Sequence, residues 1–182
     1  MRFNCAKLIF SNKRGGELKL ELLSITAENN PIYENLAQLY EAEFAPLTGE
    51  LPNENGRYRL QTPVIGEENP KNAWGYLVFE SKIPIGFAIL NIVDEVYDVA
   101  EFFVLPSHRK NKVGTKIAHW IFQIYPGSWQ VRQIDGANHA IAFWRSAISA
   151  LPGVALEERN IDDPEWGQIT KQSFSIVSEE NR

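Results

Sequence analysis

The chain of 182 residues is 44% hydrophobic, 23% charged and 12% aromatic, which is typical of one folded domain or of two small ones. Its 18 Lys and Arg against 23 Asp and Glu give a net charge of -5, which argues against nucleic acid as a partner. A single cysteine, Cys5, excludes an internal disulfide framework and a multi-cysteine metal site. No apolar run is long enough to span a membrane or to form a signal peptide. We therefore expect a cytoplasmic protein without a membrane partner, with a homodimer left open.

The N-terminal half begins with a polar, glycine-paired segment that ends at Gly16. We interpret residues 1–16 as a flexible N-terminal arm and residues 17–182 as a single domain. Alternating leucines predict a strand over residues 18–25, and apolar residues at helical spacing predict a helix over residues 31–44. Several prolines and glycines make residues 46–72 a long loop.

The pattern changes at Trp74, where three apolar strands follow one another closely. One face of a helix then spans residues 113–125 and ends before a Pro-Gly pair. The remaining predicted elements are a strand over 129–134, a helix over 140–148, and closing strands over 154–156 and 170–177 separated by a polar loop at 157–168. The three earlier strands are predicted at 74–79, 84–93 and 97–105. This order indicates a mixed α+β domain.

The most informative stretch is the junction between the third strand of this group and the helix. The strand ends at Val104-Leu105-Pro106, a polar turn follows, and the helix begins near Gly114. Unpaired backbone N–H groups and the positive end of the helix dipole suit a phosphate, Gly114 allows close approach, and Arg109 adds a positive charge. An ordinary strand-turn-helix with a stray basic run is the alternative interpretation.

This stretch resembles the GNAT superfamily of acyl-CoA-dependent N-acyltransferases, and in particular small bacterial acetyltransferases. Their signature is a strand ending Val-x-Pro followed by Arg/Gln-x-x-Gly-x-Gly/Ala at the start of a helix. The matching residues are Val104-Leu105-Pro106, Arg109-Lys110-Asn111-Lys112-Val113-Gly114, Gly86-Phe87-Ala88, residues 126–131, and Ala140 with Phe143-Trp144. The resemblance covers about residues 74–150, the expected acyl-CoA-binding core.

The resemblance implies a central mixed, mostly antiparallel sheet flanked by helices and splayed at the motif strand. It also implies acetyl-CoA as cosubstrate, no metal, and direct attack by a primary amine in a ternary complex. Backbone groups of the motif strand would pair with the pantetheine arm, as in β-augmentation, and polarise the thioester carbonyl. The residues implied to bind acetyl-CoA are Phe102, Phe103, Val104, Arg109, Lys110, Asn111, Lys112, Val113, Gly114, Thr115 and Asn138.

An attacking amine must lose a proton, and carboxylates on the motif strand are candidates for the general base. The two-residue repeat of a strand places Asp98 on the face of Phe102 and Val104, with Glu101 on the opposite face. Some family members carry a catalytic Glu at the position of Asp98. The alternatives are that Asp98 is a solvated turn residue and that Glu101 is an edge or surface charge.

Three positions depart from the family pattern. Lys112 replaces the usual first loop glycine, where its side chain would either crowd the pyrophosphate or contact the phosphates. Trp144 aligns with the usual acid tyrosine, and an indole has no proton to give at useful pH. Asn138 lies two residues before Ala140 instead of three. The alternative function is therefore a non-catalytic acyl-CoA-binding domain that acts as a sensor or interaction module, and the amine acceptor is not specified.

Overall fold

The computed structural model describes residues 6–11, 17–66, 69 and 72–177. The chain divides into two compact units. The first comprises residues 1–90 and 101–109, and the second comprises residues 91–100 and 110–182. Strand β5 (Val96–Val104) therefore contributes to both units, because the division falls after Ala100.

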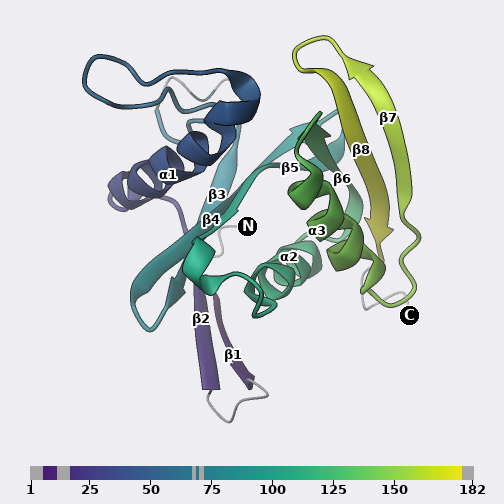
Figure 1. Cartoon of the computed structure of the whole chain (residues 1–182). Helices are drawn as coiled ribbons and strands as arrows, with labels where there is room; N and C mark the ends of the chain where they lie inside the picture. Colours follow the sequence, from purple (N-terminus) through teal and green to yellow (C-terminus); the bar gives the residue numbers. More distant parts are fainter. Residues whose placement is uncertain (1–5, 12–16, 67–68, 70–71, 178–182) are drawn as a thin grey trace. The chain divides into compact units, whose positions relative to one another are not determined.

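The first unit consists of antiparallel strands and one long helix. Its hydrogen-bonded order is β1-β2-β3-β4, followed by the end of β5. The elements are β1 (Ala6–Ser11), β2 (Glu17–Ser24), α1 (Asn30–Thr48), β3 (Trp74–Glu80) and β4 (Ile83–Val93), whose last residues belong to the second unit. Helix α1 lies along β3 and β4 (Figure 1), where Tyr33 and Tyr40 pack on Phe87 with ring centroids 5.1 and 5.7 Å away. The apolar runs predicted as strands thus form the surface on which α1 packs.

The second unit places two helices on a three-strand arrangement next to β5. Its elements are α2 (Val113–Ile124), β6 (Gly127–Ile134), α3 (Asn138–Ser149), β7 (Glu157–Asp163) and β8 (Gly167–Ile176). β5 pairs with β6 in parallel over three residue pairs, from Tyr97–Trp129 to Val99–Val131, and β6-β8-β7 continue antiparallel. α3 packs on β6 and β8 and beside α2 (Figure 1). The centre of this unit is Trp129, whose ring lies 4.8 Å from that of Phe122 and 5.0 Å from that of Tyr97.

Three sequence predictions about the strands are wrong. Ala6–Ser11, predicted as part of a flexible arm, forms β1 and pairs along its whole length with β2; the rest of that arm lies outside the described residues. The predicted strand at 154–156 is irregular, and the strand β7 occupies residues predicted as a polar loop. β7 is an edge strand with mostly exposed polar side chains, so it has no apolar alternation to reveal it, and its pairing with β8 comes from backbone hydrogen bonds.

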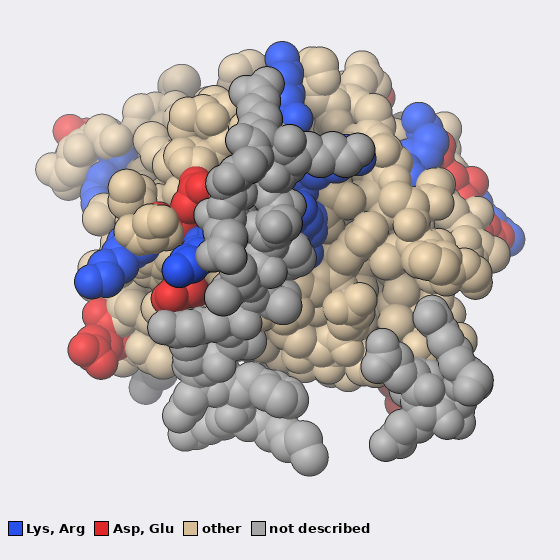
Figure 2. Space-filling model, turned by 90° about the horizontal axis from the view of Figure 1, so that it is seen from below, with Lys and Arg blue, Asp and Glu red and all other residues tan. Residues whose placement is uncertain are grey.

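The remaining elements confirm the expected class, a mixed α/β fold with mostly antiparallel pairing. The predicted splay beside Phe102–Val104 and the single-domain assignment stay predictions. No helix within the described residues is long and apolar enough to cross a membrane. On the face drawn in Figure 2, side chains of both charges are scattered among a majority of other residues.

Candidate functional site

In the first unit, the end of the motif strand is fixed closely against β4. The N–H of Leu105 donates to the carbonyl of Ile85 at 2.8 Å. A Cβ at Gly86 would lie 2.2 Å from the carbonyl oxygen of Phe103, a distance that no side chain tolerates. Gly86 is therefore required by the close approach of the two backbones, and it holds the strand carrying Phe102, Phe103 and Val104 in place.

Arg109 follows this strand after a short 3-10 turn, η1 (Pro106–His108). Its Nε donates to the carbonyl of Val104 at 2.7 Å, and its Nη2 donates to both carboxylate oxygens of Glu43 in α1 at 3.0 and 2.8 Å. The guanidinium carbon also lies 5.5 Å from the centre of the Phe103 ring. The structure therefore shows Arg109 connecting the end of β5 to α1, and its predicted contact with a phosphate stays a prediction.

The rest of the predicted phosphate loop belongs to the second unit and leads into α2. Lys110 and Lys112 have φ angles of 67° and 59°, the left-handed region that favours glycine. Lys112, which stands where the family usually has a glycine, therefore has a backbone conformation that glycine adopts readily. α2 starts at Val113 with no side-chain cap and no acidic residue in its first turn. This helix start is therefore compatible with an anion.

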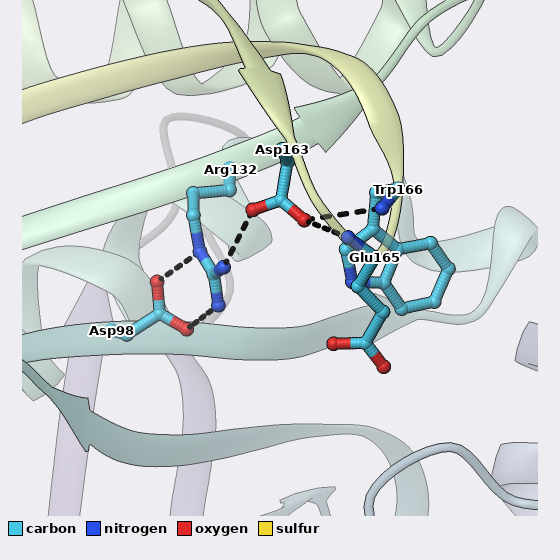
Figure 3. Close-up of polar contacts among 5 residues, drawn as sticks. All are labelled: Asp98, Arg132, Asp163, Glu165 and Trp166. Carbon is cyan, nitrogen blue, oxygen red and sulfur yellow. Dashed lines mark hydrogen bonds and ion pairs between the residues drawn. The ribbon is translucent and has the colours of Figure 1, made fainter.

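Asp98 lies in the second unit and is fully engaged in an ion pair. Both of its oxygens accept hydrogen bonds from Arg132 of β6 at 3.0 Å, and its side chain is 1% exposed (Figure 3). Arg132 also lies 3.6 Å from Asp163, which accepts the N–H groups of Glu165 and Trp166. Asp98 is thus a buried residue that joins β5 to β6 and to the end of β7. The interpretation of Asp98 as a solvated turn residue is wrong.

Glu101 lies in the first unit, where the strand repeat turns it toward α1. The Tyr33 hydroxyl lies 2.8 Å from the carbonyl of Thr62 and 3.4 Å from Glu101 Oε2. Glu101 is 4% exposed, and its Oε1 has no hydrogen-bond partner among the described residues. The pKa of Glu101 is raised to about 8, chiefly by burial and also by the charge of Glu41, while hydrogen bonds with Thr62 and Tyr33 oppose the rise. Glu101 is therefore not a surface charge, contrary to that interpretation.

Glu41 is a second buried carboxylate in the first unit, and it was not predicted from the sequence. Glu41 is 5% exposed and accepts the N–H of Gln61 at 3.3 Å. Burial raises its pKa to about 7. Its position was detectable, because Glu41 lies four residues after Ala37 and eight after Tyr33, on the apolar stripe of α1. An acidic residue within such a stripe indicates either a buried partner or a functional site.

Two other predicted positions lie in the second unit. Trp144 is 6% exposed and packs against Phe143 and Phe122 at ring distances of 4.9 and 6.2 Å, so it belongs to the core there. Asn138 is the exposed first residue of α3, and its pantetheine contact stays a prediction. Among the described residues, no group of three or more His, Cys, Asp or Glu is arranged to hold a metal ion.

A family model described as "Acetyltransferase (GNAT) family" matches residues 33–147, which is more than half of the chain. This segment includes Glu41, Asp98, Glu101 and the predicted phosphate loop. The chain belongs to the GNAT acetyltransferase family. No match was found among curated proteins.

Solved structures show the same fold at low sequence identity. An acetyltransferase from Thermus thermophilus is 18% identical, with a TM-score of 0.60 over 85% of this chain and 95% of that one. An acetyl transferase from Salmonella typhimurium that modifies the N-terminal serine of ribosomal protein L7/L12 is 14% identical, with a TM-score of 0.62 over 87% and 95%. The PaiA N-acetyltransferase from Thermoplasma acidophilum, solved with coenzyme A, is 12% identical, with a TM-score of 0.58 over 84% and 97%. These GNAT structures support the fold of this chain.

Proposed function

We propose that this GNAT protein transfers an acetyl or other short acyl group from acyl-CoA to a primary amine, with Glu101 as general base. The observation that carries this proposal is a carboxylate buried one residue before Phe102–Val104, the segment implied to receive the thioester, with a pKa of about 8. A base of that pKa takes a proton from an ammonium far more readily than an ordinary glutamate does.

The proposed reaction needs no nucleophilic side chain. The ammonium of the acceptor gives a proton to Glu101, directly or through water, and the freed lone pair attacks the thioester carbon. The new C–N bond forms as the C–S bond breaks, and the nitrogen releases its second proton to solvent as it becomes an amide. The CoA thiolate takes up a proton from solvent, because Trp144 is a buried indole that cannot supply one. A backbone N–H of Phe102–Val104 would hold the developing oxyanion.

Asp98 is the weaker candidate for the base. Its two oxygens are both occupied by Arg132, and proton transfer to Asp98 would have to displace a bidentate charge-assisted pair. Glu101 has a free oxygen and no cationic partner among the described side chains. Strand parity alone favoured Asp98 as the general base, but these contacts favour Glu101.

The phosphates of CoA are proposed to bind at Lys110–Thr115, with Asn138 near the pantetheine. The support is the uncapped start of α2 and the glycine-like backbone at Lys112, with both lysine side chains exposed. Free CoA at about 100 times its Kd should stabilise the protein by about 2.7 kcal/mol, measured as a rise in Tm.

The test compares wild type with two loop variants. Gly114→Val should abolish the CoA-dependent rise in Tm, and circular dichroism shows whether it is folded. Should Gly114→Val fail to fold, the double variant Lys110→Glu, Lys112→Glu changes only exposed side chains and should also lose the rise. A wild-type protein whose Tm is unchanged at millimolar CoA would contradict the proposed site.

Trp144 favours a second function, a GNAT domain that binds acyl-CoA without turnover. By the sequence resemblance its indole aligns with the usual acid tyrosine, and the indole is buried. A panel of primary amines, monitored for release of CoA thiol, separates the two functions. A Tm rise with CoA but no thiol release from any amine would favour the sensor.

A further inference from the structure

Glu41 and Glu101 are brought to the same short loop segment by different elements of the first unit. Glu41, from α1, accepts the N–H of Gln61, and Tyr33 places its hydroxyl between the carbonyl of Thr62 and Glu101 Oε2. Because Gln61 and Thr62 are consecutive, both carboxylates lie beside one stretch of backbone. They form a two-carboxylate cluster, here called the acid pair.

The acid pair has unused capacity for a hydrogen-bond donor. Oε1 of Glu101 is buried and has no partner among the described residues, and the hydrogen bond that Glu41 accepts from Gln61 is long, at 3.3 Å. In the part of the chain that the structure describes, neither carboxylate forms an ion pair with Lys, Arg or His. A buried acceptor without a donor destabilises the folded protein unless a ligand supplies the donor.

We propose that the acid pair is the binding site for the ammonium group of the acceptor, with Glu101 Oε1 and Glu41 as its two acceptors. This inference rests on the proposed acetyl transfer and adds the substrate class: a strongly basic primary alkylamine that binds in its charged form. Glu41 is then a positioning residue for the acceptor, and Glu101 alone receives the proton. Uncharged amines such as anilines, and alcohols of the same shape, are poor ligands.

When an ammonium binds to the acid pair, it replaces a weaker hydrogen-bond donor with a stronger one. Both carboxylates are at most 5% exposed, so the ammonium takes the place of the Gln61 N–H at Glu41. It pairs the carboxylate with a full positive charge, which is a stronger interaction than the hydrogen bond of 3.3 Å from a neutral amide. Burial lowers the local dielectric constant, which strengthens the attraction between the ammonium and the two carboxylates.

The groups around the acid pair set its pH dependence. Tyr33 and Tyr40 of α1 have pKa values raised, chiefly by burial, far above neutral, so both stay uncharged. Glu50 adds negative charge near Glu41. With pKa values of about 7 and 8, the carboxylates ionise between pH 6 and 9, while an alkylammonium stays charged to about pH 10. Affinity for the ammonium should therefore rise across that interval.

The direct test is NMR of the full chain labelled with 13C at the glutamate carboxyls. The probe is butylammonium chloride at pH 8.5, and the control ligand is butanol with an equal concentration of sodium chloride. Signals of Glu41 and Glu101 are assigned by their loss in Glu41→Gln and Glu101→Gln. We expect butylammonium, but not butanol, to shift both signals in a saturable manner.

A matched pair of variants completes the test. Glu41→Gln should weaken butylammonium binding about tenfold or more, whereas Glu34→Gln, which removes a half-exposed carboxylate from the same helix, should leave it unchanged. Equal shifts with butanol, unmoved carboxyl signals, or wild-type affinity in Glu41→Gln would each overturn the inference. The CoA-dependent Tm is measured on the same samples: loss of that rise alone refutes acyl-CoA binding, while an intact rise with silent carboxyls refutes the acid pair.

Discussion

Lys112 has a φ of 59°, a conformation that costs a side-chain-bearing residue about 1–2 kcal/mol. Lys112→Gly removes that strain but makes the unfolded chain more flexible, which costs about 0.4–1 kcal/mol. We therefore expect a net gain of about 0.5–1 kcal/mol in the free energy of unfolding, measured in urea. Lys112→Ala is the control: it keeps the strain and should show no gain. Equal effects of the two substitutions would contradict a strained backbone.

The same variant addresses the two roles left open for the Lys112 side chain. If its ammonium contacts the phosphates of CoA, Lys112→Gly weakens CoA binding and flattens its salt dependence. If the side chain crowds the pyrophosphate, the substitution tightens binding. Either outcome shows which of the two roles the Lys112 side chain has.

At the scale of elements, Asp98 and Arg132 join β5 to β6, and Arg132 extends the connection to Asp163 at the end of β7 (Figure 3). Asp98→Asn keeps the shape of the side chain but leaves the guanidinium without its main anionic partner. Because Arg132 is 27% exposed, water offsets part of this loss, and we expect a cost of about 2–4 kcal/mol in the free energy of unfolding.

Comparing the acetyl-transfer rates of Asp98→Asn and Glu101→Gln shows which of the two carboxylates is the general base. At a temperature where Asp98→Asn is fully folded, its acetyl transfer near pH 7.5 should remain within a few-fold of wild type. Glu101→Gln should lose at least about 100-fold and recover at high pH, where the free amine is abundant. The reverse result would return the role of base to Asp98.

The elements also show what the sequence could predict. Apolar periodicity located α1, α2, α3 and the strands β2 to β6, since each buries a continuous apolar face. Apolar periodicity failed at β7, whose side chains are mostly polar and exposed. It also failed at β1, which pairs with β2 across the polar segment interpreted as part of a flexible arm. For the candidate site, the predicted strand identified Asp98 and Glu101 as the carboxylates of the motif strand, and both are buried. The environments of the two carboxylates, Arg132 in one case and Tyr33 with Glu41 in the other, depend on contacts between residues distant in sequence.

At the scale of the whole molecule, the acid pair links stability to pH. Both carboxylates have folded-state pKa values, about 7 and about 8, above the value near 4.3 of an unfolded glutamate. The folded state therefore binds more protons than the unfolded state between about pH 4.5 and 8, and the free energy of unfolding falls as the pH rises through this interval. The stabilisation is present below pH 4.5 and is lost above pH 8.

We expect Glu101→Gln to remove most of this fall, because glutamine fills the same space and carries no charge at any pH. In thermal unfolding of the full chain without ligand, the Tm difference between Glu101→Gln and wild type should be small or negative at pH 5. The Tm difference should grow in favour of the variant up to pH 9. The corresponding difference in the free energy of unfolding should reach roughly a few kcal/mol, because each pKa unit corresponds to about 1.4 kcal/mol. Glu34→Gln controls for the loss of one negative charge from a chain of net charge -5, and at pH 9 the stabilisation by Glu101→Gln should exceed that by Glu34→Gln. A Glu101→Gln difference that stays flat from pH 5 to 9 would show that Glu101 is ionised throughout, and it would remove the physical basis for Glu101 as a base matched to an alkylammonium.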